Sequence, residues 1–203
     1  MRVKLINYTP HPQKSAAIAG KLCYAKSSIK DLEKITPQEE KRFIEKIIKL
    51  GHLSVIEHSS FTFAIEGISR VTSHQLVRHR LASFSQQSQR YVKKRDFEYI
   101  IPPTIKKKKK LKQIFEKVIK DINDTYAELL DNGIPAEDAR FLLPNACETK
   151  IIVTMNAREL LHFFKLRCAK NSQWEIRQMA NLMLKEVRKV APVIFKNVEK
   201  EQR

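Results

Sequence analysis

The first quarter of the chain alternates between stretches that suit a strand and stretches that suit a helix. Residues 3–8 alternate weakly between apolar and polar side chains, which predicts a short strand, and the alanine-rich stretch 14–25 predicts a helix. A second helix follows Thr36, because Thr36 and Glu39 form a capping box, and Gly51 is a natural C-terminal stop. The pattern therefore predicts one strand and two helices in this region.

The middle of the chain predicts a half-buried strand followed by a helix. Phenylalanines and an isoleucine alternate with smaller residues over 60–65, as expected of a strand that packs on one face. A serine can cap the next helix, predicted over 69–80, in which spacings of three and four residues place Gln75 and Arg78 on neighbouring faces. Residues 91–99 alternate again, which predicts an extended segment.

Helices dominate the prediction for the second half. An apolar stripe predicts a long amphipathic helix over 111–129, and a short helix follows from Pro135 to Leu142. The β-branched run 151–155 is typical of a buried strand. The two remaining helices each begin with a capping pair, Asn156 with Glu159 and Ser172 with Glu175. We expect an α/β (α+β) fold in which residues 1–203 form a single domain, with a central, mostly antiparallel sheet flanked by long helices.

The net charge favours anionic partners without choosing among them. The 203 residues suffice for one domain with a substantial core and carry a formal charge of +17, which attracts nucleic acids and small polyanions alike. Cys23, Cys147 and Cys168 are far apart and form no CxxC pair, so we expect a reduced, cytoplasmic protein without a disulfide framework. No apolar run approaches the ~20 residues of a transmembrane helix, so we expect no membrane partner.

Five consecutive lysines, Lys106 to Lys110, are the strongest local signal for nucleic acid. They support an alternative function, a basic nucleic-acid-binding module without catalysis. The run leads directly into the long amphipathic helix and has no interleaved aromatic residues on which bases could stack. We therefore expect a solvated entry turn and no specific nucleic-acid partner.

The segment from Arg78 to Tyr91, RHRLASFSQQSQRY, has the composition of an anion-binding site. It combines three arginines with hydroxyl and amide side chains and contains no acid. Guanidinium groups pair bidentately with phosphate or carboxylate, and the neutral donors complete the oxygen shell. Its one histidine, His79, is the only metal ligand of the usual kind, so no metal site is expected. Residue types alone are equally consistent with a solvated helix end and loop.

The spacing within this segment resembles the signature of the flavin-dependent thymidylate synthases: Arg-His-Arg, seven residues, then Ser88. Ser85 and Gln86 depart from the commonest form of the motif, in which asparagine and glutamate are frequent. Similar blocks occur elsewhere in the family's order, at Gly51 to His58, Ala139 to Pro144 and Asn156 to Arg167. Within the last block His162 replaces a frequent asparagine.

The resemblance implies an enzyme that reductively methylates dUMP to dTMP. It implies 5,10-methylenetetrahydrofolate as the carbon donor, FAD as the hydride source, NADPH as the reductant, and a homotetramer with shared active sites. The residues implied for dUMP are Gln75, Leu76, Val77, Arg78, Gln86, Gln87, Ser88, Gln89, Arg90, Arg140 and Arg167. Those implied for FAD are Ser54, Arg78, His79, Arg80, Gln86, Asn156, Ala157, Arg158 and His162, with His52 near the flavin and the nicotinamide.

The resemblance also implies Arg167 as the catalytic residue. A guanidinium cannot usefully release its proton, so Arg167 would act by stabilising negative charge on the pyrimidine ring. No Ser-His-acid spacing would activate Ser88 as a nucleophile, so we expect Ser88 to bind rather than react. The residues leave open a second route, in which Cys147 or Cys168 adds to the ring as a thiolate.

Overall fold

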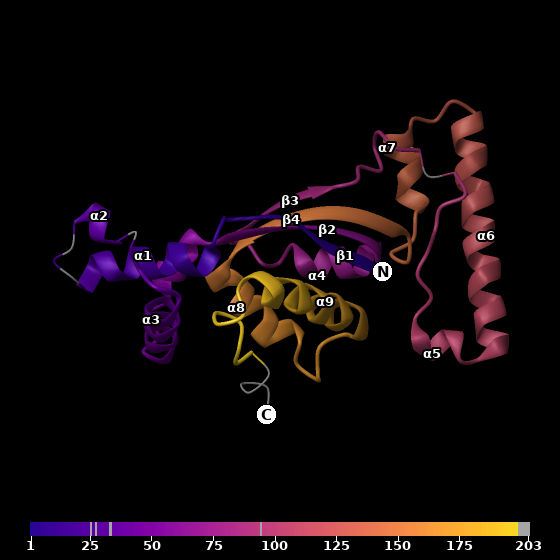
Figure 1. The fold of residues 1–203 in the computed structure, drawn as a ribbon. Coiled ribbons are helices and arrows are strands. Elements are labelled where there is room, and N and C mark those ends of the chain that lie inside the picture. The colour runs from indigo at the N-terminus through magenta and orange to yellow at the C-terminus, as the bar shows by residue number, and fades with distance from the viewer. Residues whose placement is uncertain (25, 27, 33, 94, 199–203) are drawn as a thin grey trace.

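The computed structural model of the chain describes residues 1–24, 26, 28–32, 34–93 and 95–198 (Figure 1). One four-stranded sheet forms its centre, in the order β1-β2-β4-β3, and every neighbouring pair is antiparallel. The strands are β1 (Arg2–Tyr8), β2 (Ser60–Ser69), β3 (Ala82–Gln86) and β4 (Glu148–Asn156). The predicted antiparallel sheet of a mixed α and β fold is confirmed.

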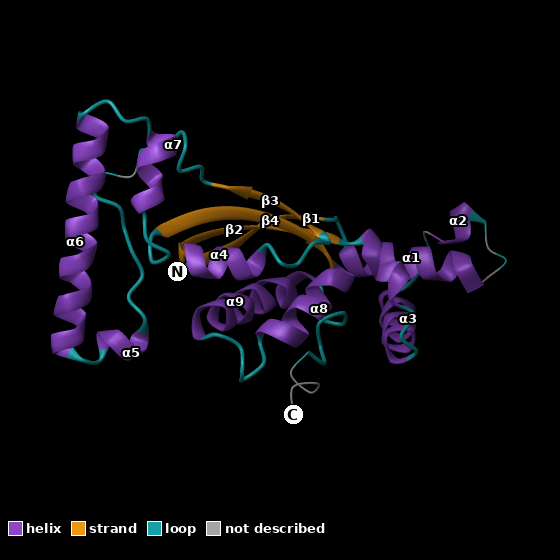
Figure 2. Ribbon diagram, turned by 180° about the vertical axis from the view of Figure 1, so that it is seen from behind, coloured by secondary structure: helices purple, strands orange, loops and turns teal. Residues whose placement is uncertain are grey.

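The two central strands bury one face of the sheet. Phe61 and Phe63 of β2 and Val153 of β4 are fully buried, as the alternation over 60–65 predicts. The helices α4 (Arg70–Leu76), α8 (Ala157–Arg167) and α9 (Trp174–Val190) all lie on this side (Figure 2). On the other face Thr62 and Thr154 share a hydrogen bond of 2.9 Å, and Ile152 is 43% exposed.

The N-terminal helices extend from one end of the sheet. They are α1 (Pro12–Tyr24), α2 (Ile29–Leu32), α3 (Pro37–Lys49) and the 3-10 helix η1 (Leu53–His58). The capping box of Thr36 and Glu39 forms as predicted, and Gly51 follows α3 with a positive φ of 74° that suits glycine. The expected end of the first helix at residue 25 lies outside the described residues.

A second helical layer stands at the other end of the sheet (Figure 1). It contains α5 (Pro103–Lys106), α6 (Lys109–Asp131), α7 (Ala136–Ala139) and the 3-10 helix η2 (Arg140–Leu142). Ile119 and Tyr126 of α6 are buried, whereas Ile114 and Val118 of the same apolar stripe are 53% and 50% exposed. All five lysines from Lys106 to Lys110 are exposed, and α6 begins within that run. No helix of the described part of the chain is long and apolar enough to span a membrane.

Two predictions around the arginine-rich segment were wrong. The helix capped by Ser69 ends at Leu76 rather than at residue 80, so Gln75 and Arg78 do not share a helix face. Leu76, the last residue of α4, packs into the core, and the chain turns after it. Six residues later the chain pairs as β3 with β4, a strand that the sequence did not predict. The segment described as a loop therefore contains the edge strand of the sheet.

Two further local predictions were also wrong. The described residues 91–93 and 95–99 do not form the expected extended segment, apart from an isolated bridge at Tyr99, because the chain turns there and contacts α6. Arg95 pairs there with Asp131 at 2.5 Å. The N-cap of α9 is Gln173 rather than the predicted Ser172. The side-chain oxygen of Gln173 accepts from the backbone N–H groups of residues 175 and 176.

Candidate functional site

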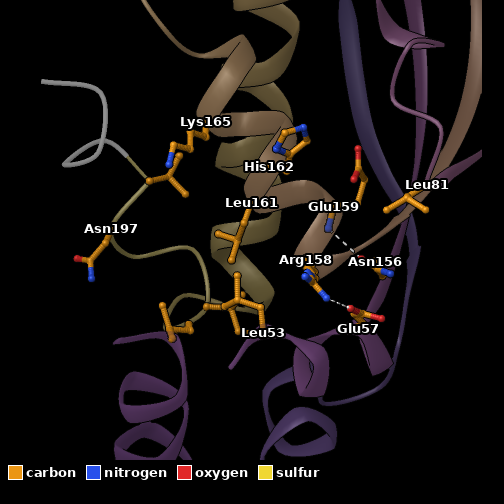
Figure 3. Close-up of a pocket in the computed structure, with 13 residues that line it drawn as sticks. Leu53, Glu57, Leu81, Asn156, Arg158, Glu159, Leu161, His162, Lys165 and Asn197 are labelled. Atoms are coloured by element: carbon orange, nitrogen blue, oxygen red, sulfur yellow. Dashed lines mark hydrogen bonds and ion pairs between the residues drawn. The ribbon is translucent and has the colours of Figure 1, made fainter. Parts of the chain in front are cut away.

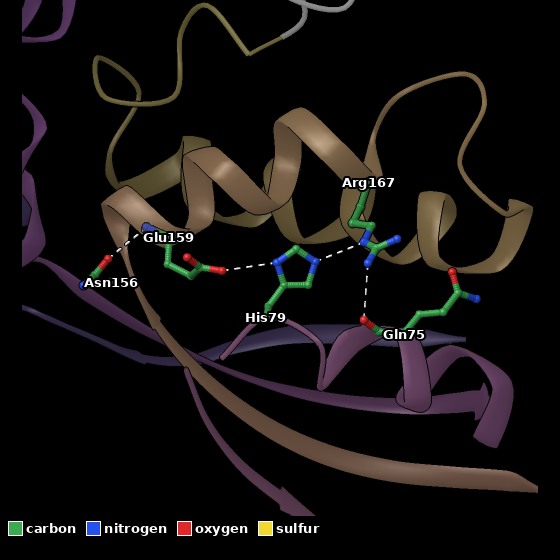
Figure 4. Close-up of polar contacts among 5 residues, drawn as sticks. All are labelled: Gln75, His79, Asn156, Glu159 and Arg167. Atoms are coloured by element: carbon green, nitrogen blue, oxygen red, sulfur yellow. Dashed lines mark hydrogen bonds and ion pairs between the residues drawn. The ribbon is translucent and has the colours of Figure 1, made fainter. Parts of the chain in front are cut away.

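Five residues converge between the end of α4 and helix α8, and we call them the His79 cluster: Gln75, Arg78, His79, Glu159 and Arg167. Glu159 lies in the first turn of α8 and Arg167 is its last residue. His79 Nδ1 lies 3.2 Å from Glu159 Oε1, and Arg167 Nε donates to His79 Nε2 at 3.0 Å (Figure 4). Both ring nitrogens of His79 are therefore engaged, and the ring is only 5% exposed.

The contacts determine the protonation of His79. The Nε atom of an arginine can only donate, so Nε2 of His79 must be unprotonated, and the ring proton resides on Nδ1, where it is donated to Glu159. Burial lowers the pKa of His79 below its usual value; the hydrogen bond to Glu159 opposes this change and the charge of Arg167 adds to it. His79 is therefore a neutral imidazole that links a carboxylate to a guanidinium.

Arg167 has a second anchor and a cationic neighbour. Its Nη2 lies 3.5 Å from the carbonyl oxygen of Gln75. Burial lowers the pKa of Arg167, and the charge of nearby Arg78 lowers it further. Two guanidinium groups held close to each other create a strong local attraction for an anion or an electron-rich ring.

A cavity of about 760 Å³ lies along α8, and we call it the α8 cavity (Figure 3). Three residues predicted to contact FAD, Asn156, Arg158 and His162, line it. The other lining residues come from α3, η1, α8 and the segments around β3 and the C-terminus: Ile48, Leu53, Glu57, Leu81, Glu159, Leu161, Lys165, Ile194, Asn197 and Val198.

The lining of the α8 cavity fits a flavin nucleotide. Arg158 and His162, one helical turn apart on α8, present cationic and hydrogen-bonding groups suited to a diphosphate. Leu53 and Leu161 supply apolar surface, and the volume falls within the range of about 300 to 1,000 Å³ typical of ligand pockets. Arg158 Nη1 donates to Glu57 Oε1 at 2.5 Å, so one carboxylate already partners this cation.

A third group of charges gathers at the other end of the sheet, and we call it the Arg140 cluster: Arg70, Arg90, Glu137 and Arg140. Arg90 Nε lies 2.5 Å from a carboxylate oxygen of Glu137, and Arg140 Nε donates to the Glu137 carbonyl at 3.0 Å. Burial lowers the pKa of Arg70, and the positive charge of Arg140 lowers it further. The cluster thus brings three guanidinium groups together with one carboxylate, and this positive balance suits a phosphate ligand.

The segment that follows β3 makes several contacts within the chain. Gln86 donates from its amide to Thr149 Oγ1 at 3.1 Å, and Gln89 donates to Cys147 Sγ at 3.7 Å. The hydroxyl of Ser88 accepts from the backbone N–H of Arg90 at 3.1 Å. These bonds fix the conformation of the segment beside the Arg140 cluster. The contacts of Gln86, Gln87, Ser88 and Gln89 with dUMP stay predictions.

The structure does not bring all the predicted substrate residues together in one chain. The His79 cluster lies between the sheet and α8, whereas Arg90 and Arg140 lie near α7, beyond the end of the sheet (Figure 1). Among the described residues no hydrogen bond or ion pair given by the structure joins the two groups. One chain therefore presents two separate cationic groups.

The other predicted residues differ in accessibility. Ser54 and Arg80 are exposed, Leu76 is buried, and Val77 is 40% exposed. Ala157, at the start of α8, is fully buried, so a ligand could approach only its backbone. Their proposed ligand contacts stay predictions.

His52 is held by a residue that the sequence did not single out. The hydroxyl of Tyr24 lies 2.7 Å from His52 Nδ1, and the two rings are nearly parallel, with centroids 6.1 Å apart. Tyr24 is 61% exposed, so this pair lies at the surface.

Comparison with known proteins decides between an anion-binding surface and an enzyme site. A family model described as thymidylate synthase complementing protein matches residues 4–193. The chain belongs to this family. It is 54% identical to the flavin-dependent thymidylate synthase of Geobacter sulfurreducens, with 97% of this chain and 86% of the relative covered. Similar proteins of the same name come from Clostridium tetani, at 48% identity with 97% and 86% covered, and Sulfurisphaera tokodaii, at 49% with 98% and 77% covered.

Family membership confirms the resemblance that the sequence motifs indicated and leaves individual residue roles to be argued from the structure. Sequence reasoning did not place Glu159 in the candidate site because it assigned Glu159 to a helix cap. The backbone N–H of Glu159 is indeed capped by Asn156 Oδ1 at 2.9 Å, but its carboxylate contacts His79. It also missed Arg70, which has no motif around it, and Glu137.

The cysteines are poorly placed for nucleophilic chemistry. Cys147 is fully buried and Cys168 is 7% exposed, whereas Cys23 is exposed on α1. A thiolate nucleophile needs access to its substrate and a positive environment. Within the described ranges, no group of three or more His, Cys, Asp or Glu side chains is arranged to hold a metal ion.

Proposed function

We propose that this member of the family, acting as a single domain over residues 1–203, converts dUMP to dTMP in the cytoplasm. The carbon comes from 5,10-methylenetetrahydrofolate and the reducing equivalents from NADPH, through FAD. The observation that carries the proposal is the position of Arg167. This residue of α8, the helix that lines the α8 cavity, is hydrogen-bonded to His79 and lies near the guanidinium of Arg78. The cavity would take the flavin, and the two guanidinium groups would take the pyrimidine.

Arg167 has the central catalytic role in this proposal. Carbon C5 of uracil is a poor nucleophile until negative charge develops on the ring. A guanidinium near N3 and O4 stabilises that charge and, since it keeps its proton in proteins, it does so without serving as a base. Its bonds to His79 and Gln75 use only part of its donor set, so other N–H groups remain for the ring.

The α8 cavity would hold FAD through Asn156, Arg158 and His162, with Ser54 contributing from a neighbouring subunit. When bound, FAD supplies the hydride that completes the methyl group. Arg158 would pair with the diphosphate, and His52 would lie near the isoalloxazine ring. His79 has both ring nitrogens engaged, so any contact it makes with the flavin would use its backbone.

The nucleotide would be bound at two points. Gln75, Arg78 and Arg167 would contact the base, and Ser88, Arg90 and Arg140 would bind the phosphate. Because these groups lie apart in one chain, we propose that a second subunit completes each site, within a homotetramer.

Anaerobic turnover tests the proposal. Protein loaded with FAD should convert labelled dUMP to dTMP when NADPH and methylenetetrahydrofolate are supplied. Arg167→Ala should retain FAD, seen by its visible absorption, but lose ~3 to 4 kcal/mol of transition-state stabilisation, roughly a few hundredfold in rate. A protein that takes up no FAD, or an Arg167→Ala variant with normal turnover, contradicts the proposal.

The thiol route is tested separately. Replacement of all three cysteines by serine should preserve turnover in protein that still folds, because none of the three thiols has a role in the proposal and two of them are buried. Loss of turnover in a folded triple variant would favour a thiolate at C6.

A further inference from the structure

We propose that Glu159 is a positioning residue that holds the guanidinium of Arg167 in its working orientation through His79. The inference rests on the proposed function, since it takes Arg167 as the group that stabilises the pyrimidine. Glu159 acts through two hydrogen bonds and contacts no reacting atom in this proposal.

The geometry forms a continuous chain from carboxylate to guanidinium. Glu159 Oε1 accepts from His79 Nδ1 at 3.2 Å, and His79 Nε2 accepts from Arg167 Nε at 3.0 Å. Glu159 and His79 are 6% and 5% exposed. Water has little access to either partner, so a lost link is not replaced by solvent and leaves a buried polar group without its bond.

The carboxylate matters because it selects the tautomer of His79. With the proton on Nδ1, the lone pair of Nε2 faces the N–H of Arg167. In the other tautomer, an N–H of the imidazole would face an N–H of the guanidinium, and the bond would be lost. Carboxylates orient metal-binding and catalytic histidines in the same way, by fixing which nitrogen carries the proton. Here a guanidinium takes the place of the metal.

Arg167 needs this anchor for two reasons. Its other contact, to the carbonyl oxygen of Gln75, is 3.5 Å long and therefore weak. The nearby charge of Arg78 repels it. Without its bond to the imidazole of His79, the long side chain of Arg167, the last residue of α8, would be free to turn away from Arg78.

The side chain of Glu159 is not required to start α8. Its backbone N–H, rather than its carboxylate, takes the helix cap from Asn156 at 2.9 Å. Substitutions at Glu159 therefore leave the cap in place and alter the contact with His79. Glu148→Gln offers a matched control. Glu148 is another buried glutamate, at 4% exposure, and it accepts from the backbone N–H of Gly67 at the start of β4, the end of that strand away from α8.

The experiment combines kinetics with nitrogen NMR on the assembled, FAD-loaded enzyme. Glu159→Ala should lower kcat for dTMP formation by about tenfold to a hundredfold, the usual cost of losing a carboxylate behind an orienting histidine. The KM for dUMP and the affinity for FAD should change much less. Glu159→Gln, whose amide oxygen can still accept from His79, should give an intermediate kcat, and Glu148→Gln should keep the wild-type kcat.

The NMR arm separates positioning from general destabilisation. In wild-type protein labelled with ¹⁵N-histidine and assigned with a His79→Gln sample, Nδ1 should carry the proton and Nε2 should not. In Glu159→Ala the proton should shift partly to Nε2. Wild-type protein with Nε2 protonated overturns the inference whether or not the variants fold. So does a folded Glu159→Ala variant with a kcat within about threefold of wild type, against the larger loss expected.

Failure of the proposed function would look different. If wild-type enzyme makes no dTMP, the reaction assignment fails, while the protonation of His79 still reports on the contact chain. If wild-type enzyme makes dTMP but Glu159→Ala makes it equally fast, only the positioning role fails.

Discussion

Arg158 and Glu57 form an ion pair across the edge of the α8 cavity, although they are 101 positions apart in the sequence. Their side chains are 53% and 42% exposed, so the pair itself adds little to the free energy of unfolding, at most about 1 kcal/mol. Its position on the lining of the cavity points to ligand binding rather than stability.

Arg158→Ala should therefore weaken FAD binding while leaving the protein folded. Loss of a charge-assisted hydrogen bond to phosphate should raise the Kd for FAD by roughly tenfold to a hundredfold, as measured by flavin fluorescence. The melting temperature of the FAD-free protein should change little. Glu57→Gln is the control: it keeps the guanidinium and removes the competing carboxylate, so the Kd for FAD should not rise. An Arg158→Ala variant with wild-type affinity would exclude Arg158 from the flavin site.

Arg140→Ala should weaken the binding of dUMP. Arg140 is one of the three guanidinium groups of the Arg140 cluster, and its loss should raise the Kd for dUMP by about tenfold or more in calorimetric titration. Deoxyuridine, which has no phosphate, should bind equally well to the variant and the wild type. Arg95→Ala is a suitable control, because it removes an arginine paired with Asp131 on α6, outside both clusters. Equal losses in the two variants would show that net charge, rather than the Arg140 cluster, attracts the nucleotide.

Local signals in the sequence predicted most of the elements because those signals act over a few residues. The capping box at Thr36 and the alternation of Phe61 and Phe63 depend only on near neighbours, and both formed as expected. Strand β3 has only a short alternation, in which Ala82 and Phe84 pack inward and the serines between and after them are exposed, and its conformation depends on pairing with β4. A non-local pairing of this kind cannot be seen in the local pattern.

The candidate site likewise combines residues that local motifs predict with contacts that only the tertiary structure shows. The family motifs indicated His79 and Arg167 as functional residues. That His79 would lie between Glu159 and Arg167, which are 80 and 88 positions away, follows from the packing of α8 against the turn after α4. Glu159 had a sufficient local explanation as a capping residue, and its second role requires the tertiary structure.

The lowered pKa of His79 predicts a loss of stability in mild acid. The unfolded chain binds a proton at about pH 6.5, whereas the folded protein resists protonation because the imidazole is buried and faces Arg167. Three side chains of α8 shift the pKa of His79: Glu159 raises it, whereas Arg167 and His162 lower it. The contribution of neutral His79 is therefore complete above about pH 6.5 and is lost as the pH falls through the lower folded-state pKa.

His79→Gln should reduce this pH dependence. The melting temperature of wild-type protein should fall more steeply than that of the variant between about pH 7 and pH 5, because only the wild type must protonate a buried imidazole. The other five histidines are present in both proteins, so their contributions cancel when the two melting temperatures are subtracted at each pH. Parallel curves for the two proteins would mean that His79 is already protonated, or readily protonated, in the folded state.

Mixed assemblies should reveal whether one site uses two subunits. Arg140→Ala and Arg167→Ala homo-oligomers should each be nearly inactive, because every site lacks one guanidinium. If Arg140 and Arg167 of a site come from different subunits, co-expression of the two variants with separate affinity tags should create some sites with both arginines intact. Random assembly in equal amounts should restore about a quarter of wild-type turnover, since each arginine is native in half of the subunits. Hybrids carrying both tags but showing no recovery would place both arginines in the same chain, and the two clusters would then have to approach each other by a rearrangement of the fold.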